Sequence, residues 1–186
     1  MMNVARKSVW GGIFIAIGTL VFLSLYPSPL GAFLFSVGLL SIFLLELKLF
    51  TGAVTYLDKT NWREVGLILV CNLVGCALLF LLPPSEIAAT IVQNKASAWP
   101  LLIFVRSALC GVMISSAVLC HKKNTTWMSM LYVMVFILAG FDHSIANACF
   151  IISGREFTWS ALKLFLISVA GNTVGSVAFY RTGVKK

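Results

Sequence analysis

The sequence predicts an all-α membrane protein with six transmembrane helices in two inverted three-helix repeats. Its apolar composition, its six apolar segments and a short internal repeat lead to this prediction. Of the 186 residues, 60% are hydrophobic and 11% are charged, against about 45–50% and about 25% in an average soluble domain. So few charges would not solvate a small soluble domain, and so apolar a chain would not stay disordered.

The six apolar segments are near the length, about 20 residues, that crosses a bilayer. They span residues 10–26, 30–56, 65–82, 99–120, 127–152 and 159–180. Arg6 and Lys7 precede the first segment, so a cleaved signal peptide is an alternative interpretation of it. No small-x-small cleavage site follows clearly, and we therefore expect an uncleaved first helix.

The basic residues predict the orientation of these helices. The net charge of +8 sits mostly between apolar segments, which favours topology over nucleic-acid binding as its cause. With a cytoplasmic N-terminus, Lys95 and Arg155 lie outside. Nine other basic residues then lie on the cytoplasmic side: Arg6, Lys7, Lys59, Arg63, Lys122, Lys123, Arg181, Lys185 and Lys186. We therefore expect a multi-pass protein of the cell (inner) membrane with both termini in the cytoplasm.

An internal repeat divides the single expected domain, residues 1–186, at about residue 95. Residues 72–75 (Asn-Leu-Val-Gly) match residues 172–175 (Asn-Thr-Val-Gly). Ser8 and the following glycine at 12 similarly match Ser107 and Gly111. Repeat 1 (about 1–95) and repeat 2 (about 96–186) hold three spans each. Because three is odd, the repeats insert with opposite orientation, which places a substrate site near the midplane.

The second and fifth segments are long and interrupted at corresponding positions. Glu46, Lys48 and the pair Thr51-Gly52 interrupt the second, and residues 140–147 (Gly-Phe-Asp-His-Ser-Ile-Ala-Asn) interrupt the fifth. Irregular backbone at this depth is tolerated only where protein or a cavity satisfies it. We therefore expect helices 2 and 5 to be broken and to border a pore.

His143 is the sharpest candidate for chemistry, because histidine exchanges protons near neutral pH and is costly to charge within a membrane. The alternative is a neutral core histidine bonded to a carbonyl. Asp142 is adjacent and would diverge from it on a helix, so we expect Asp142 to cap the broken helix or to bond backbone. A role of Asp142 in pairing or selectivity is the other interpretation. Asn72 and Asn172 are expected to bond loosened backbone, and Asn172 alternatively also touches His143.

Glu46 and Lys48 are two further charges within apolar sequence. On a regular helix they would point to different faces. Buried charges need partners or water. In a broken helix the two residues therefore either pair with each other or each meets a partner elsewhere, and Arg106 is one candidate for such a partner. A direct pore role for either residue is the other interpretation.

No further constellation suggests catalysis. Five cysteines lie in or beside apolar segments and form no Cys-x-x-Cys pair, so neither a disulfide framework nor a zinc site is indicated. The sequence also offers no carboxylate pair, metal cluster or nucleophile motif. We therefore expect no enzyme, no cofactor and no metal. An intramembrane enzyme that uses His143 and Asp142 remains as an alternative class.

Several of these motifs resemble the formate/nitrite transporter family. Residues 141–147 are similar to the family's Phe-Glu-His-Ser-Ile-Ala-Asn stretch, and residues 49–52 to its Leu-Phe-Thr-Gly loop in the broken second helix. Residues 172–175 resemble the sixth-helix Asn-x-Val-Gly, and residues 106–117 more weakly resemble the fourth-helix signature. Lys95 falls where the family carries a vestibule lysine. The resemblance covers essentially the whole chain.

The resemblance implies an aquaporin-like fold, a homopentamer with one pore per protomer, and transport of small monovalent anions such as formate, nitrite, hydrosulfide, acetate or lactate. It implies that His143, Thr51 and Asn172 serve the pore and a proton relay, and that Lys95 attracts the anion. The constrictions would be formed by Phe35, Leu39, Leu49, Phe50, Ile114 and Phe136. Apolar constrictions reject a bare anion but pass its neutral acid, so we expect proton-linked transport.

The chain departs from the family at several positions. The family usually has Gly and an acidic residue where Glu46 and Lys48 stand, and Asn where Gly111 stands. It has Val-Cys-Leu in place of residues 114–116 and Glu in place of Asp142. These departures put the substrate in question more than the fold. The alternatives are a channel for another small solute, including a neutral one, and a non-conducting accessory membrane subunit.

Overall fold

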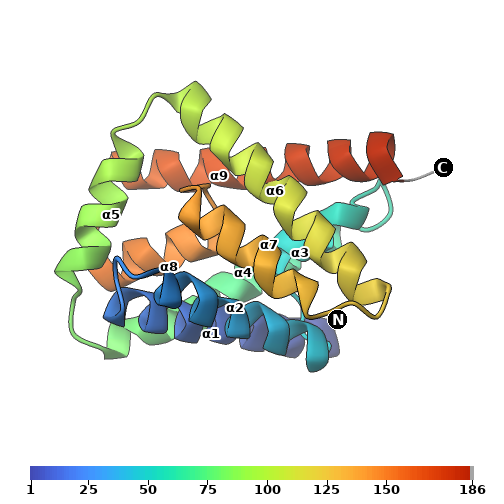
Figure 1. Cartoon of the computed structure of the whole chain (residues 1–186), viewed down its shortest axis with the longest axis horizontal. Coiled ribbons are helices and arrows are strands. Elements are labelled where there is room, and N and C mark those ends of the chain that lie inside the picture. Colours follow the sequence, from blue (N-terminus) through green and yellow to red (C-terminus); the bar gives the residue numbers. More distant parts are fainter. Residues whose placement is uncertain (185–186) are drawn as a thin grey trace.

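Figure 1 shows the computed structural model, which describes residues 1–184. Lys185 and Lys186, counted above with the cytoplasmic cations, lie outside the described residues. The described residues form helices and no strand, which confirms the prediction of an all-α protein. The long helices are α1 (Met2–Ser24), α4 (Trp62–Cys76) continued by η2 (Ala77–Leu81), α6 (Pro100–Lys122), and α9 (Trp159–Ala178) continued by the π-helical turn η3 (Phe179–Val184). Each of these four is long and apolar enough to cross a membrane.

The other two apolar segments each contain more than one helix. Residues 30–56 contain most of α2 (Pro29–Leu44) together with α3 (Phe50–Ala53) and η1 (Val54–Tyr56). Residues 127–152 contain α7 (Met128–Leu138) and most of α8 (Ser144–Gly154). Non-helical residues separate α2 from α3 and α7 from α8, at the positions where the sequence carries its polar interruptions.

One helix was not expected. α5 (Glu86–Ala96) lies where the sequence analysis assigned no element, and it crosses the left end of the molecule in Figure 1. The Ser85 side chain caps it by accepting a hydrogen bond from the Ala88 N–H, with Glu86 in the first turn and Lys95 in the last. These charges complement the helix dipole. α5 is too short and too polar to give a membrane-span signal, but it fixes the position of Lys95.

Glycines bring the long helices together in the same way in both halves. α1 packs on α4, and α6 packs on α9. A Cβ atom at Gly75 would overlap the Val9 carbonyl, and one at Gly175 would overlap the Ala108 carbonyl. Both helix pairs therefore approach to backbone contact, as small residues allow between membrane helices.

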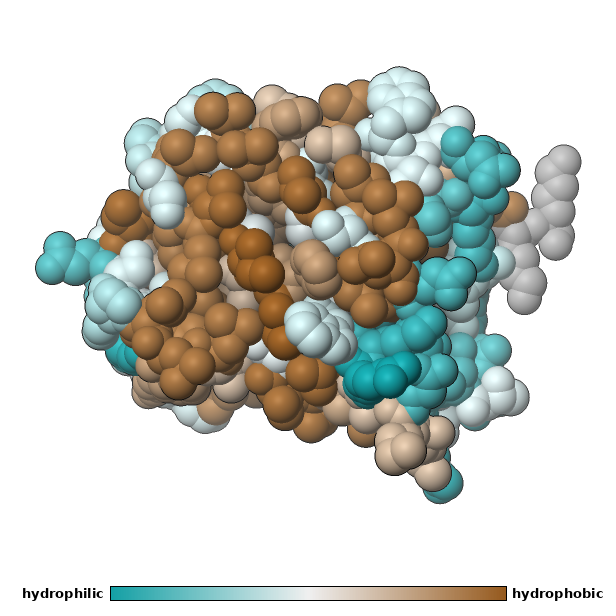
Figure 2. Space-filling model, turned by 90° about the horizontal axis from the view of Figure 1, so that it is seen from below, coloured by the Kyte–Doolittle hydropathy of each residue, from teal (hydrophilic) through white to brown (hydrophobic). Residues whose placement is uncertain are grey.

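Apolar side chains cover much of the outer surface. In Figure 2 they spread over most of the visible face, whereas hydrophilic residues gather at its right end. Trp10, Ile17, Val70 and Leu166 are examples of exposed large apolar residues. An apolar surface of this extent needs lipid or another protein to cover it. Both termini lie at one end of the molecule, opposite α5 (Figure 1).

The helices before the two interruptions end in the same cap. Glu46 has φ 50° and Gly140 has φ 70°, so both residues adopt the left-handed conformation. The next N–H then bonds back across the turn, from Leu47 to the Ile42 carbonyl and from Phe141 to the Phe136 carbonyl. Glycine is the residue that accepts this conformation without steric cost. Glu46 is therefore strained where its counterpart is not.

We predict that Glu46→Gly raises stability by about 0.5–1 kcal/mol, because it relieves the left-handed strain. The change removes an ion pair to Lys7, but the Glu46 side chain in that pair is 83% exposed, and such pairs are worth little. The measurement is the thermal unfolding midpoint in detergent.

The matched control is Gly140→Ala, because no atom lies within 4 Å of the added Cβ and only the backbone conformation is affected. This variant should lower the midpoint. A lower midpoint for Glu46→Gly would contradict the assignment of strain.

Candidate functional site

His143 lies at the start of α8, where it is 2% exposed. Its Nδ1 accepts a hydrogen bond from the Ala146 N–H at 3.1 Å, so the ring itself caps α8. Since Nδ1 uses its lone pair as an acceptor, the proton of the neutral ring is on Nε2. Nε2–H therefore donates to Thr51 Oγ1 on α3, at 2.9 Å. The geometry is that of a neutral histidine with both ring nitrogens engaged.

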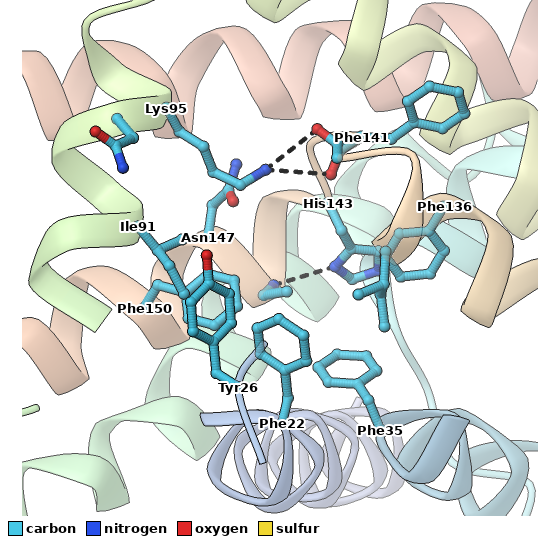
Figure 3. Close-up of a pocket in the computed structure, with 14 residues that line it drawn as sticks. Phe22, Tyr26, Phe35, Ile91, Lys95, Phe136, Phe141, His143, Asn147 and Phe150 are labelled. Atoms are coloured by element: carbon cyan, nitrogen blue, oxygen red, sulfur yellow. Dashed lines mark hydrogen bonds between the residues drawn. The ribbon is translucent and has the colours of Figure 1, made fainter. Parts of the chain in front are cut away.

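Asp142 does not cap α8, so the expectation that its side chain caps the helix or bonds backbone was wrong, and pairing, the other interpretation, is what the structure has. Its buried carboxylate turns toward α5, and Oδ1 accepts a hydrogen bond from Lys95 Nζ on that helix at 2.7 Å. The same oxygen accepts a hydrogen bond from Asn147 Nδ2 on α8 at 3.2 Å. Lys95 Nζ also donates to the carbonyls of Gly140 at 3.4 Å and Phe141 at 3.3 Å, as Figure 3 shows. The ammonium group thus ties α5 to the turn before His143.

A cavity of about 230 Å³ lies between Lys95 and His143, and we call it the His143 cavity. Six Phe and Tyr residues are among the residues that line it (Figure 3). Phe136 stacks on the His143 ring, with ring centroids 5.5 Å apart and an interplanar angle of 16°. Phe35 meets Phe136 edge-on, with centroids 6.4 Å apart. The cavity therefore offers one cation, one imidazole and two asparagines, Asn94 and Asn147, among largely apolar walls.

A second cavity of about 320 Å³, the Lys48 cavity, shares no lining residue with the first. Its polar lining includes Lys48 and Glu64, and its apolar lining includes Leu39 and Leu49. The proposed constriction residues are all 4% exposed or less: Phe35, Leu39, Leu49, Phe50, Ile114 and Phe136. Phe35 and Phe136 line the His143 cavity, Leu39 and Leu49 line the Lys48 cavity, and Phe50 and Ile114 line neither.

Glu46 and Lys48 do not pair with each other or with Arg106. Lys48 Nζ lies 2.7 Å from Glu64 Oε1, and Glu46 Oε2 lies 3.6 Å from Lys7 Nζ. The sequence left open whether Glu46 and Lys48 pair with each other or with residues elsewhere, and the structure shows that each pairs with a residue elsewhere. Both side chains are also more exposed than their apolar sequence surroundings indicated.

Asn172 fixes the main chain on both sides of His143. Its Oδ1 accepts a hydrogen bond from the Ser144 N–H, and its Nδ2 donates to the carbonyls of Ser107 and Asp142, all at 2.8 Å. The expected backbone role is therefore what the structure shows. Its amide is fully engaged in these bonds, and no hydrogen bond joins it to His143 within residues 1–184.

Asn72 makes the same three bonds in the first half. Its Oδ1 accepts from the Phe50 N–H at 2.8 Å. Its Nδ2 donates to the Ser8 carbonyl at 2.7 Å and to the Lys48 carbonyl at 3.0 Å. The two asparagines thus serve the two non-helical stretches in parallel.

Sequence reasoning missed two partners in the site. Asn147, which was noted only as part of the histidine stretch, donates to both Asp142 and Ser168. Glu64, which was given no role, is the partner of Lys48. An acidic residue in the first turn of an apolar helix was the available signal for Glu64. In the part of the chain that the structure describes, no group of three or more His, Cys, Asp or Glu side chains is placed to hold a metal ion.

Comparison with known proteins gives three findings. The family model described as formate/nitrite transporter matches residues 1–184, which confirms the resemblance inferred from the motifs. No curated protein sequence matches significantly. A structure described as a pentameric formate channel with formate bound superposes with a TM-score of 0.82 at 20% identity, over 96% of this chain and 93% of that one. A structure described as an FNT family ion channel gives a TM-score of 0.84 at 20% identity, over 96% and 87%.

We predict that Asn172→Ala lowers the free energy of unfolding by about 3 kcal/mol or more, because it leaves buried main-chain groups unsatisfied at about 1–3 kcal/mol each. Thr173→Val is the matched control, since the Thr173 hydroxyl bonds only within its own helix. The thermal unfolding midpoint in detergent is measured for both variants. Equal midpoints for the two variants would show that Asn172 does not hold the turn.

Proposed function

This chain belongs to the formate/nitrite transporter family, and from this premise we propose that it is a membrane channel for small monovalent anions of weak acids, linked to protons through His143. Formate, nitrite, hydrosulfide, acetate and lactate are the candidate substrates. One observation carries the proposal: a neutral, buried histidine lines a largely apolar cavity whose one cationic residue, within residues 1–184, is Lys95.

The proposed architecture has six spans in two inverted repeats within one domain, in an aquaporin-like fold. In this proposal α2 with α3, and α7 with α8, are the broken second and fifth spans. The matching bonds of Asn72 and Asn172 and the matching caps at Glu46 and Gly140 support the repeat. The shared fold with a structure described as pentameric, and the apolar outer surface, support a homopentamer in the cell (inner) membrane.

The end that carries both termini is proposed to face the cytoplasm, because most basic residues lie in the segments joined at that end. The helix α5, which carries Lys95 in its last turn, then lies at the outer end (Figure 1). The His143 cavity becomes an outer vestibule, and the Lys48 cavity becomes its cytoplasmic counterpart.

The proposed path starts with attraction of the anion to Lys95, whose charge raises the local anion concentration. Phe35 and Phe136 oppose passage of a desolvated anion but pass its neutral acid. His143 relays the proton only after it gains one at Nδ1, and the Ala146 N–H bond must then open. The Nε2 proton, which His143 now donates in a hydrogen bond to Thr51 Oγ1, is the one that passes to the substrate. The proton-carrying state is thus disfavoured at rest.

We predict that purified protein in liposomes moves at least one of the five anions and that an imposed pH gradient drives the flux. His143→Ala should slow that flux by about 100-fold, the usual scale of a lost general acid–base group. His143→Asn keeps a polar side chain but exchanges no proton, so it should lose gradient-driven flux as well.

Assembly of each variant is verified by size-exclusion chromatography. Flux that is independent of both the pH gradient and His143 would overturn the proton role. Absence of flux for every anion, with intact assembly, would favour another solute or a non-conducting accessory subunit.

We predict that Lys95→Gln raises the KM for outside anion by about 5-fold through loss of local attraction. The single change also leaves the buried Asp142 carboxylate without its cation, so the double variant Lys95→Gln with Asp142→Asn separates capture from folding. Lys95→Arg retains the charge and should restore the KM toward the wild-type value. Concentration dependence of initial uptake gives these constants, and an unchanged KM in the double variant would remove Lys95 from capture.

A further inference from the structure

Each cavity is lined by one lysine that pairs with a carboxylate, and the lysine and the acid exchange places between the two non-helical stretches. Beside the His143 cavity the acid, Asp142, stands two residues before α8, and its lysine, which lines the cavity, comes from α5. In the Lys48 cavity the lysine stands two residues before α3, and its acid, Glu64, comes from α4. The carbonyls of Asp142 and Lys48 accept the equivalent bonds from Asn172 and Asn72. The two positions therefore correspond, with opposite charges.

The two pairs differ in how firmly they are held. The side chains of Lys95 and Asp142 are 18% and 1% exposed, and Asn147 and two carbonyls add further bonds. Those of Lys48 and Glu64 are 37% and 46% exposed. Exposed ion pairs contribute little stability and exchange readily with solvent and solutes. Lys48 is thus a cation that a soluble anion can reach.

The main chain of Lys48 is held by hydrogen bonds to two other segments, whereas its side chain is held by Glu64. Its N–H donates to the Lys7 carbonyl at 3.3 Å, and its carbonyl accepts from Asn72. An anion that binds Nζ therefore orders one side chain without reorganising the loop, which keeps the entropic cost of binding low. The pair lines a cavity of about 320 Å³, with room for a small anion beside it.

We propose that Lys48 is the binding residue of a second anion site, at the inner mouth, and that Glu64 is its built-in competitor. The ligand is a small monocarboxylate, because it replaces the Glu64 carboxylate at Nζ with the same chemistry. This inference rests on the proposed function, whose inner vestibule the Lys48 cavity would be. The site would capture anions that leave the cytoplasm.

The surrounding charges fit this arrangement. An adjoining cavity of about 380 Å³ is also lined by Lys48, together with Lys7, Glu46 and His121. Glu46 is engaged with Lys7, and His121 stacks on Phe43 and is hydrogen-bonded to Thr126. Glu64 is therefore the carboxylate that competes directly for Lys48 Nζ.

The test is formate flux from each face, in vesicles of defined orientation at equal pH on both sides. Lys48→Gln should raise the KM on the cytoplasmic face by about 5-fold without lowering the maximal rate, and Glu64→Gln should lower that KM by about 3-fold. The KM on the outer face should change less than 2-fold. Lys123→Gln removes an exposed lysine outside the cavity lining and is the matched control. Changes of the same sign in both variants, or none, would overturn the site.

A second measurement is independent of transport. In solubilised full-length protein, formate should slow acylation of Lys48 by an amine-reactive reagent about 3-fold, with Lys123 as the internal reference. Glu64→Gln should increase this protection. Protection without any flux would uphold the anion site and reject the proposed channel function, whereas flux without protection would reject the site and leave the channel function standing.

Discussion

The arrangement depends on one constraint, which is that main-chain polar groups leaving a helix inside an apolar bundle must find partners. Asn72 and Asn172 meet it with three hydrogen bonds each. They reach the turns only because Gly75 and Gly175 bring their helices to backbone contact with α1 and α6. Helix packing, the position of the turns and the orientation of His143 are therefore consequences of the same small set of contacts.

The same constraint explains the electrostatics of the His143 cavity. Asp142 is buried and would be costly as an unpaired charge, and Lys95 together with Asn147 offsets that cost. Because α5 supplies the lysine, the connection between the halves is part of the site rather than a passive link. His143, by contrast, has neutral partners, Thr51 and the Ala146 N–H. The cavity lining therefore combines a fixed, paired charge at Lys95 with a neutral ring at His143.

Much of this was accessible from sequence because the relevant signals are local. A polar stretch such as 140–147 inside apolar sequence marks where a helix must end, and an asparagine repeated in register marks what satisfies the freed backbone. The cap could not be assigned in this way, since His143 and Asp142 are adjacent and only the position of Lys95 decides which side chain turns away. The partners of Glu46 and Lys48 likewise depend on how α1 and α4 sit beside the turn.

The departures from the family pattern at Glu46 and Lys48 are compatible with the fold for a physical reason. The main chain stabilises this turn through the left-handed cap at Glu46 and through the Lys48 carbonyl, which accepts a hydrogen bond from Asn72. Both side chains extend to an exposed rim, where they meet Lys7 and Glu64. Charge at this rim can therefore change in sign without loss of the turn, because the hydrogen bonds that hold the turn come from the main chain.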